Sequence, residues 1–122
     1  MTAGGAGNAW ACRCTEPAPR QAFRAADGVV LGKIVSVTRE NGEGDVLFAF
    51  DVSESWKRNL EGRITVHTGT TCGFDADVGQ TYVLFLKPRG AGGYETARCM
   101  GNRSEADAAP VLKYLRRRKP AR

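Results

Sequence analysis

Residues 29–37 read VVLGKIVSV, and this stretch decides the fold. Its β-branched and apolar side chains predict a strand. Gly32 interrupts that strand, and a glycine inside a strand commonly marks a bulge or a sharp bend. A long first strand with such a bend is what a small β-barrel needs to turn its corner.

Four later stretches also predict strands, with turn signals between them. Residues 46–52 (VLFAFDV) and 63–68 (RITVHT) alternate apolar with smaller or polar side chains, so each offers one face for burial. Residues 80–86 (QTYVLFL) and 94–99 (YETARC) predict the fourth and fifth strands. Five antiparallel strands in a chain of 122 residues indicate a closed barrel, because closure removes the exposed strand edges.

A short helix is expected before the first strand, at residues 21–27 (QAFRAAD). Ala22, Phe23 and Ala26 would form its buried face, and Gly28 would end it by adopting a positive φ. The two prolines in residues 15–20 leave little room for regular structure ahead of this helix.

A second helix is expected at residues 104–118, with Ser104 as its cap. Pro110 should kink or restart this helix. The apolar residues at helical spacing, which we expect on one face, are Ala108, Val111, Leu112 and Leu115.

The composition, 42% hydrophobic and 25% charged, is that of a single globular domain. No apolar run approaches the roughly 18 residues of a membrane span. The formal charge is +5, and much of the excess lies in Lys113, Arg116, Arg117, Arg118, Lys119 and Arg122. Such a run is typical of a solvated tail, with nucleic acid or an acidic membrane surface as the alternatives. We therefore divide the chain into a segment outside the fold (1–11), a domain (12–118) and a basic tail (119–122).

Four cysteines are present: Cys12, Cys14, Cys72 and Cys99. Structural zinc sites usually take ligands in close pairs, whereas here only one close pair, C-x-C, occurs, and there is a single histidine. Two disulfides explain the pattern better than zinc and imply an oxidising compartment. Four cysteines allow three pairings, and the spacing does not choose among them.

Catalytic motifs are missing from the sequence, and we interpret the chain as a non-enzymatic binding protein without a cofactor. His67 is expected on a strand, at the surface or half-buried. The candidate carboxylates Asp27, Asp51, Asp75 and Asp77 are spread along the chain and suggest no catalytic pair. Asn102, in the sequence Asn-Arg-Ser, matches a glycosylation acceptor. Nucleic acid is not favoured as a partner, because most aromatic residues occupy core-like positions.

From Cys12 the sequence reads CRCTEPAPRQAFRAADGVV. It resembles the N-terminus of the tissue inhibitors of metalloproteinases, in which C-x-C is followed by a proline-containing stretch and Q-A-F. Later segments in the family's order are FDVSESWK (50–57) and VHTGTTCGF (66–74), and residues 79–84 and 96–99 fit the next two strands. The similarity extends to about Leu115 and suits a single-domain, bacterial-type form of this netrin-like domain.

The resemblance implies a five-stranded oligonucleotide/oligosaccharide-binding (OB) barrel with two flanking helices. It also implies two disulfides, Cys12–Cys72 and Cys14–Cys99. Arg24 stands where the family has one half of a third disulfide, and no cysteine remains for the other half.

The resemblance further implies inhibition of zinc metalloproteinases by chelation. The α-amine and carbonyl oxygen of Cys12 would bind the protease's zinc and displace the water that the zinc activates. The inhibitory wedge would comprise Cys12, Arg13, Cys14, Thr15 and Glu16. A neighbouring ridge would comprise Thr70, Thr71 and Cys72. Arg13 is unusual in bulk and charge for its position, which affects the choice of target.

Chelation requires that Cys12 carry a free α-amine. Ala9, Trp10 and Ala11 form a small-x-small pattern of the kind that signal peptidase accepts, so residues 1–11 are interpreted as a leader remnant or a disordered tail. We expect a secreted or periplasmic monomer whose partner is a zinc metalloproteinase or another extracellular protein. The alternative is a netrin-like protein-binding module of the same fold without inhibitory activity.

Overall fold

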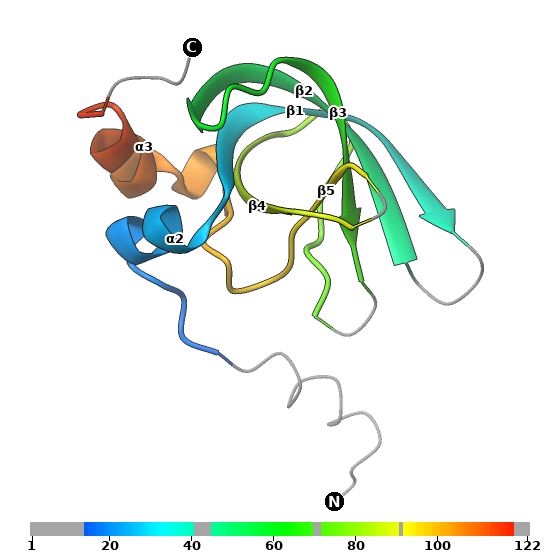
Figure 1. Cartoon of the computed structure of the whole chain (residues 1–122), viewed down its shortest axis with the longest axis horizontal. Helices are drawn as coiled ribbons and strands as arrows, with labels where there is room; N and C mark the ends of the chain where they lie inside the picture. Colours follow the sequence, from blue (N-terminus) through cyan, green and yellow to red (C-terminus); the bar gives the residue numbers. More distant parts are fainter. Residues whose placement is uncertain (1–13, 41–44, 70–71, 91, 119–122) are drawn as a thin grey trace, which may run out of the picture.

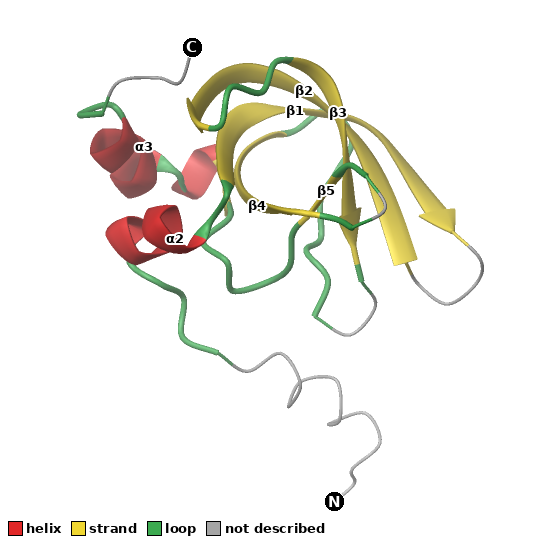
Figure 2. Cartoon of the chain, in the orientation of Figure 1, coloured by secondary structure: helices red, strands yellow, loops and turns green. Residues whose placement is uncertain are grey.

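The computed structural model of the chain describes residues 14–40, 45–69, 72–90 and 92–118. A curved sheet closes on itself, and two short helices pack against one side of it (Figures 1 and 2). The elements in chain order are α2 (Pro19–Ala25), β1 (Gly28–Glu40), β2 (Asp45–Lys57), β3 (Gly62–Thr68), β4 (Thr81–Pro88), β5 (Tyr94–Glu95), β6 (Arg103–Ser104), a 3₁₀ turn (Glu105–Asp107) and α3 (Ala109–Leu115).

The strands pair in the order β1-β2-β3-β5-β4-β6, and β1 also pairs with β4. This additional pairing closes five strands into a barrel, as the sequence predicted. The expectation that all strands are antiparallel was wrong at one place, because β3 and β5 run parallel through Val66–Tyr94 and His67–Glu95. β6 pairs with β4 at Tyr82 and Val83 and was not expected from the sequence.

Gly32 marks an irregularity in β1, as predicted. The register between β1 and β2 shifts between Leu31 and Gly32. A Cβ at this position would collide with the backbone carbonyl of Asp51 and lie 2.8 Å from the ring of Phe50. The strand can therefore approach β2 this closely only with glycine here.

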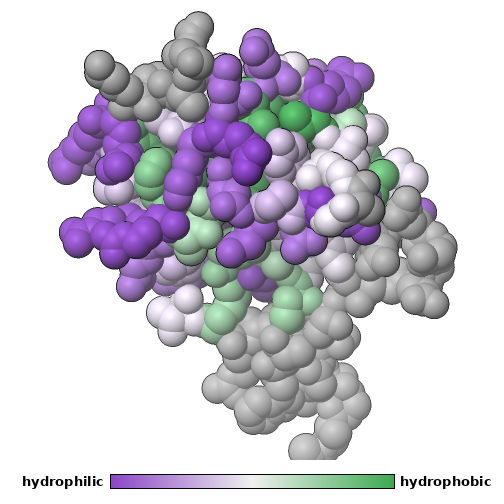
Figure 3. Space-filling model, in the orientation of Figure 1, coloured by the Kyte–Doolittle hydropathy of each residue, from purple (hydrophilic) through white to green (hydrophobic). Residues whose placement is uncertain are grey.

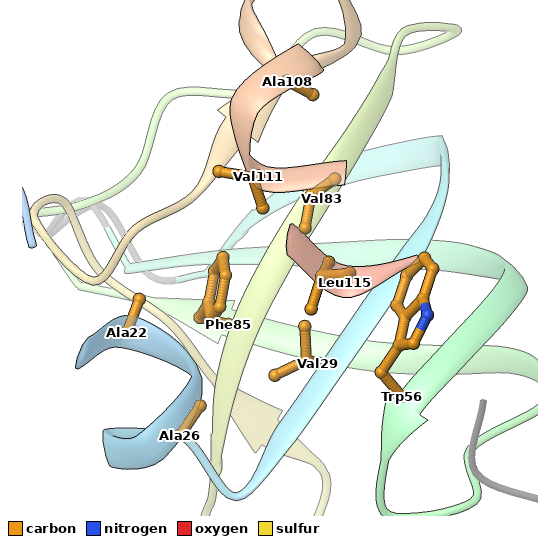
Figure 4. Packing of buried hydrophobic residues seen from close by; sticks show 9 residues of the cluster. All are labelled: Ala22, Ala26, Val29, Trp56, Val83, Phe85, Ala108, Val111 and Leu115. Carbon is orange, nitrogen blue, oxygen red and sulfur yellow. The ribbon is translucent and has the colours of Figure 1, made fainter. Parts of the chain in front are cut away.

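Two clusters of buried side chains form the core. One fills the barrel and includes Ile34, Phe48, Phe50 and Leu84. The other lies between the barrel and the helices (Figure 4) and comprises Ala22, Ala26, Val29, Trp56, Val83, Phe85, Ala108, Val111 and Leu115. Because both of its faces are covered, β4 has a continuous apolar run from Tyr82 to Leu86 instead of an alternating one.

The N-terminal helix was predicted two residues too late in the chain. It begins at Pro19, which is tolerated in a first helical turn because the N–H that proline lacks has no partner there. Ala22 and Ala26 are buried as expected, and Phe23 is half-buried. Gly28 does not end the helix, because the chain has already become extended at Ala26 (ψ 152°) and Gly28 is the first residue of β1.

The C-terminal helix is shorter than predicted. β6 and the 3₁₀ turn occupy the first part of residues 104–118, and Pro110 lies in the first turn of α3, where it restarts the helix. Ser104 makes no capping hydrogen bond to the backbone; its hydroxyl lies 3.4 Å from a carboxylate oxygen of Asp107. Val111 and Leu115 face the core as expected. No helix in the described ranges is long and apolar enough to cross a membrane.

Asp51 and Arg63 form an ion pair between β2 and β3. The guanidinium donates from Nε at 2.7 Å and from Nη2 at 3.1 Å, one to each carboxylate oxygen. The hydrogen bond from Arg63 lowers the pKa of the Asp51 carboxyl, and the positive charges of Arg63 and Lys33 act in the same direction. Asp51, one of the candidate carboxylates, is thus engaged with an arginine on the outside of the barrel.

Arg58 has a left-handed backbone (φ 65°) in the turn after β2. A side chain disfavours this conformation by about 1–2 kcal/mol, whereas glycine adopts it readily. We expect Arg58→Gly to raise the free energy of unfolding by about 0.5 kcal/mol, after allowing for glycine's greater freedom in the unfolded chain. Urea denaturation would measure the change. Arg58→Ala keeps the unfavourable φ and should not stabilise; equal stabilisation by both variants would contradict the explanation.

Candidate functional site

A disulfide between Cys14 and Cys99 ties the start of the described chain to the segment that follows β5. The two Cα atoms lie 6.2 Å apart and 85 residues apart in the sequence. This confirms one of the two pairings that the family resemblance implied. The other, Cys12–Cys72, stays a prediction, because Cys12 lies outside the described residues.

The three wedge residues that the structure describes are exposed. Cys14, Thr15 and Glu16 run without regular structure from the disulfide towards α2. A carboxylate oxygen of Glu16 lies 3.3 Å from Nη1 of Arg103, the first residue of β6. The segment is therefore fastened at both ends, covalently at Cys14 and by an ion pair at Glu16. Cys12 and Arg13 lie outside the described residues.

The loop that carries Cys72 attaches to the same place. The backbone N–H of Arg98 donates to the carbonyl oxygen of Cys72 at 2.8 Å, one residue before the disulfide at Cys99. Residues 98–99 therefore contact both the wedge and the ridge that the sequence proposed. Of the ridge residues, Thr70 and Thr71 lie outside the described residues.

The Cys72 loop has its own supports. The Thr68 hydroxyl accepts a hydrogen bond from the backbone N–H of Phe74 at 2.8 Å. A Cβ on Gly73 would collide with the carbonyl oxygen of Gly69. The closeness of these two backbones explains why glycine follows the cysteine.

Asn102 and Thr96 hold residues 96–102 against β4. Along this edge of β4, Val83 pairs with β6 and Lys87 pairs with β5. Phe85, which lies between these two residues of β4, therefore faces the gap between β6 and β5. At this gap the Asn102 side-chain oxygen accepts from the Phe85 N–H at 2.7 Å, and the Thr96 hydroxyl donates to the Phe85 carbonyl at 2.8 Å. Two side chains therefore take the place of a strand.

The same network corrects the prediction of a strand over residues 94–99, because only Tyr94–Glu95 is a strand. After Thr96 the chain turns through left-handed conformations at Cys99 (φ 72°) and Gly101 (φ 106°), which a regular strand does not contain. The turn brings Cys99 to face Cys14. The sequence predicted Cys99 as a disulfide cysteine, but no sequence pattern indicated that Asn102 supports the turn that carries it.

Asn102 also lies in the predicted glycosylation motif. Its side-chain nitrogen, the atom that would carry a glycan, donates to the Thr96 hydroxyl at 2.8 Å and to the Ala97 carbonyl at 3.2 Å. A glycan would therefore break internal hydrogen bonds, and the folded structure argues against this use of the motif.

His67 is half-buried on β3, which agrees with the sequence-based prediction. Its Nε2 lies 3.3 Å from Nη1 of Arg89 in a cavity of about 310 Å³. Among the described residues, the hydroxyls that line this cavity belong to Thr68 and Thr96, and both already bond the backbone. Within the described ranges, no group of three or more His, Cys, Asp or Glu side chains is placed to hold a metal ion.

Comparison of the chain with models of known protein families and with curated proteins finds no match. The function is therefore inferred from the motifs of the sequence and the geometry of the Cys14–Cys99 region.

Proposed function

We propose that this chain is a secreted or periplasmic, non-enzymatic domain that inhibits zinc metalloproteinases through the α-amine and carbonyl oxygen of Cys12. The observation that carries the proposal is the convergence at residues 98–99. The exposed segment that begins two residues after Cys12 is covalently bound there, and the Cys72 loop is hydrogen-bonded there. A C-x-C terminus held in this way loses little conformational entropy when it binds.

The barrel suits this proposal. The circular order β1-β2-β3-β5-β4, with β3 and β5 parallel, supports an OB-type barrel. A rigid barrel of this kind would present the wedge on an immobile base. The expected disulfide Cys12–Cys72 would fix the terminal residue itself, and the Cys14–Cys99 disulfide supports the proposed oxidising compartment.

The test compares two N-termini. One protein starts at Cys12 after cleavage of a fusion partner, and the other retains Ala11. Both are titrated against a panel of zinc endopeptidases with a fluorogenic peptide. We expect the first protein to inhibit at least about 100-fold more strongly, because an amide nitrogen at Cys12 cannot chelate zinc as an amine does.

Arg13→Ala, made in the protein that starts at Cys12, shows whether the arginine restricts the choice of target. Equal inhibition by both N-termini would rule out chelation. No inhibition of any protease by either protein, with both disulfides verified by peptide mapping, would favour the netrin-like binding module instead.

A further inference from the structure

A groove lined by positive charge lies between the two helices. α2 and α3 lie side by side on the barrel (Figure 1), and hydrophilic side chains gather over them (Figure 3). The groove has a volume of about 260 Å³. Its lining, called the cationic groove below, consists of Arg20, Phe23, Arg24, Lys57, Tyr114 and Arg118.

Two aromatic rings hold one of these cations in place. The rings of Phe23 on α2 and Tyr114 on α3 meet edge to face, with centroids 6.0 Å apart. The guanidinium of Arg118 lies 4.4 Å from the Phe23 centroid and donates to the Tyr114 hydroxyl at 2.9 Å. Arg118 therefore packs on the domain instead of belonging to a solvated tail.

The last turn of α2 holds the ammonium group of Lys57 in place. Its ammonium donates to the carbonyl oxygens of Phe23 at 2.7 Å and Arg24 at 3.2 Å, and it lies 5.0 Å from the Phe23 centroid. The carbonyl end of a helix attracts a cation, so this charge is fixed at the floor of the groove.

Within the described residues, no acidic side chain balances the charge in the groove. Arg116, close by in the sequence, pairs with Glu54 at 2.8 Å. By contrast, none of the four groove cations has a carboxylate within salt-bridge distance in the described parts of the chain. Arg20 and Arg24, one helical turn apart on α2, are exposed. Such a cluster repels itself, and a multivalent anion would relieve the repulsion.

We propose that the cationic groove binds an anionic polysaccharide, whose sulfate or carboxylate groups the arginines would contact. Arginine presents a planar set of donors that matches such groups. A linear glycan can lie in a groove between two helices and place successive charges against Arg20, Arg24 and Arg118. This binding is independent of the proposed inhibition, because none of the wedge and ridge residues that the structure describes lines the groove.

The geometry argues against two other polyanions. Single-stranded nucleic acid binds by stacking bases on open aromatic faces, but Arg118 already covers Phe23. A membrane-surface site usually inserts apolar side chains. In the described chain the exposed large apolar residue is Val78, 58% exposed, in the loop before β4 and outside the groove.

Isothermal titration of the full chain tests the proposal, with a heparin-derived oligosaccharide as the sulfated probe and an oligogalacturonate as the carboxylate probe. We expect the variant Arg20→Gln/Arg24→Gln to raise the Kd of the glycan that binds by about tenfold or more at low salt. Added salt should weaken binding of the unmutated chain more steeply than binding of this variant, because fewer ions are released from the variant's complex.

The matched control is Lys33→Gln/Arg39→Gln, which removes the same formal charge from exposed positions on β1. We expect less than a twofold change in Kd, roughly, because these residues lie outside the groove. Equal weakening by both pairs would reduce the binding to net charge and overturn the proposal. So would failure of both glycans to bind at low salt, or tighter binding to single-stranded DNA or phosphatidylserine vesicles than to either glycan.

Discussion

Removal of the Cys14–Cys99 disulfide by the paired substitution Cys14→Ser/Cys99→Ser is expected to lower the free energy of unfolding by about 4.5 kcal/mol. The bond closes a loop with a sequence separation of 85 residues, so its loss gives the unfolded chain much additional freedom. Domains of this size are stable by roughly 5–15 kcal/mol, so the variant would approach the limit of folding. Guanidinium denaturation of both proteins would measure the difference.

Glu16→Gln distinguishes the disulfide's contribution to stability from that of the ion pair that fastens the same segment. Glu16 and Arg103 are both accessible to solvent, and such a pair contributes roughly 0–1 kcal/mol. We therefore expect Glu16→Gln to retain nearly all of the stability. If the paired serine substitutions lowered stability by less than about 1 kcal/mol, the bond would not be the main constraint on this segment.

Much of the barrel could be predicted because its signals are local. Phe48 and Phe50 alternate with smaller residues along β2, and Gly32 interrupts an apolar strand; both patterns concern neighbours in the sequence. The parallel pairing of β3 with β5 could not be predicted in this way. β5 contains only two residues, and its place follows from contacts with strands far away in the sequence.

In the candidate site, too, the features with a signal in the sequence could be predicted and those that depend on distant contacts could not. The cysteine count predicted disulfides, and the family resemblance implied that Cys14 pairs with Cys99. Their support by Asn102 depends on a backbone group 17 residues away, and no local spacing signals it.

The cationic groove was missed for a related reason. Its side chains come from α2, β2, α3 and the residues after α3, so the sequence shows them as unrelated charges. In the sequence Arg118 is one of a run of basic residues near the end of the chain, and nothing there indicates its contact with Phe23.

Asn102→Ala is expected to lower the free energy of unfolding by about 3 kcal/mol. The substitution leaves the N–H of the buried Phe85 without its acceptor, and it removes the two donors that reach Thr96 and Ala97. An orphaned buried donor costs roughly 1–3 kcal/mol, and the two lost bonds add to that cost. Thermal and urea denaturation would measure the total, and hydrogen exchange should show faster exchange of the Phe85 amide.

Asn59→Ala is the matched control, because Asn59 is exposed in the turn between β2 and β3 and its loss should change stability by less than about 0.5 kcal/mol. Thr96→Val tests the other half of the network, since it keeps the volume but removes the hydroxyl that bonds Phe85. If Asn102→Ala and Asn59→Ala lowered the free energy of unfolding equally, the Asn102 hydrogen bonds at the gap beside Phe85 would not be what stabilises this part of the fold. If instead Asn102→Ala also made the Cys14–Cys99 bond easier to reduce, Asn102 would be a positioning residue for the wedge. Its side chain donates to the carbonyl oxygen of Ala97, where the turn that presents Cys99 begins.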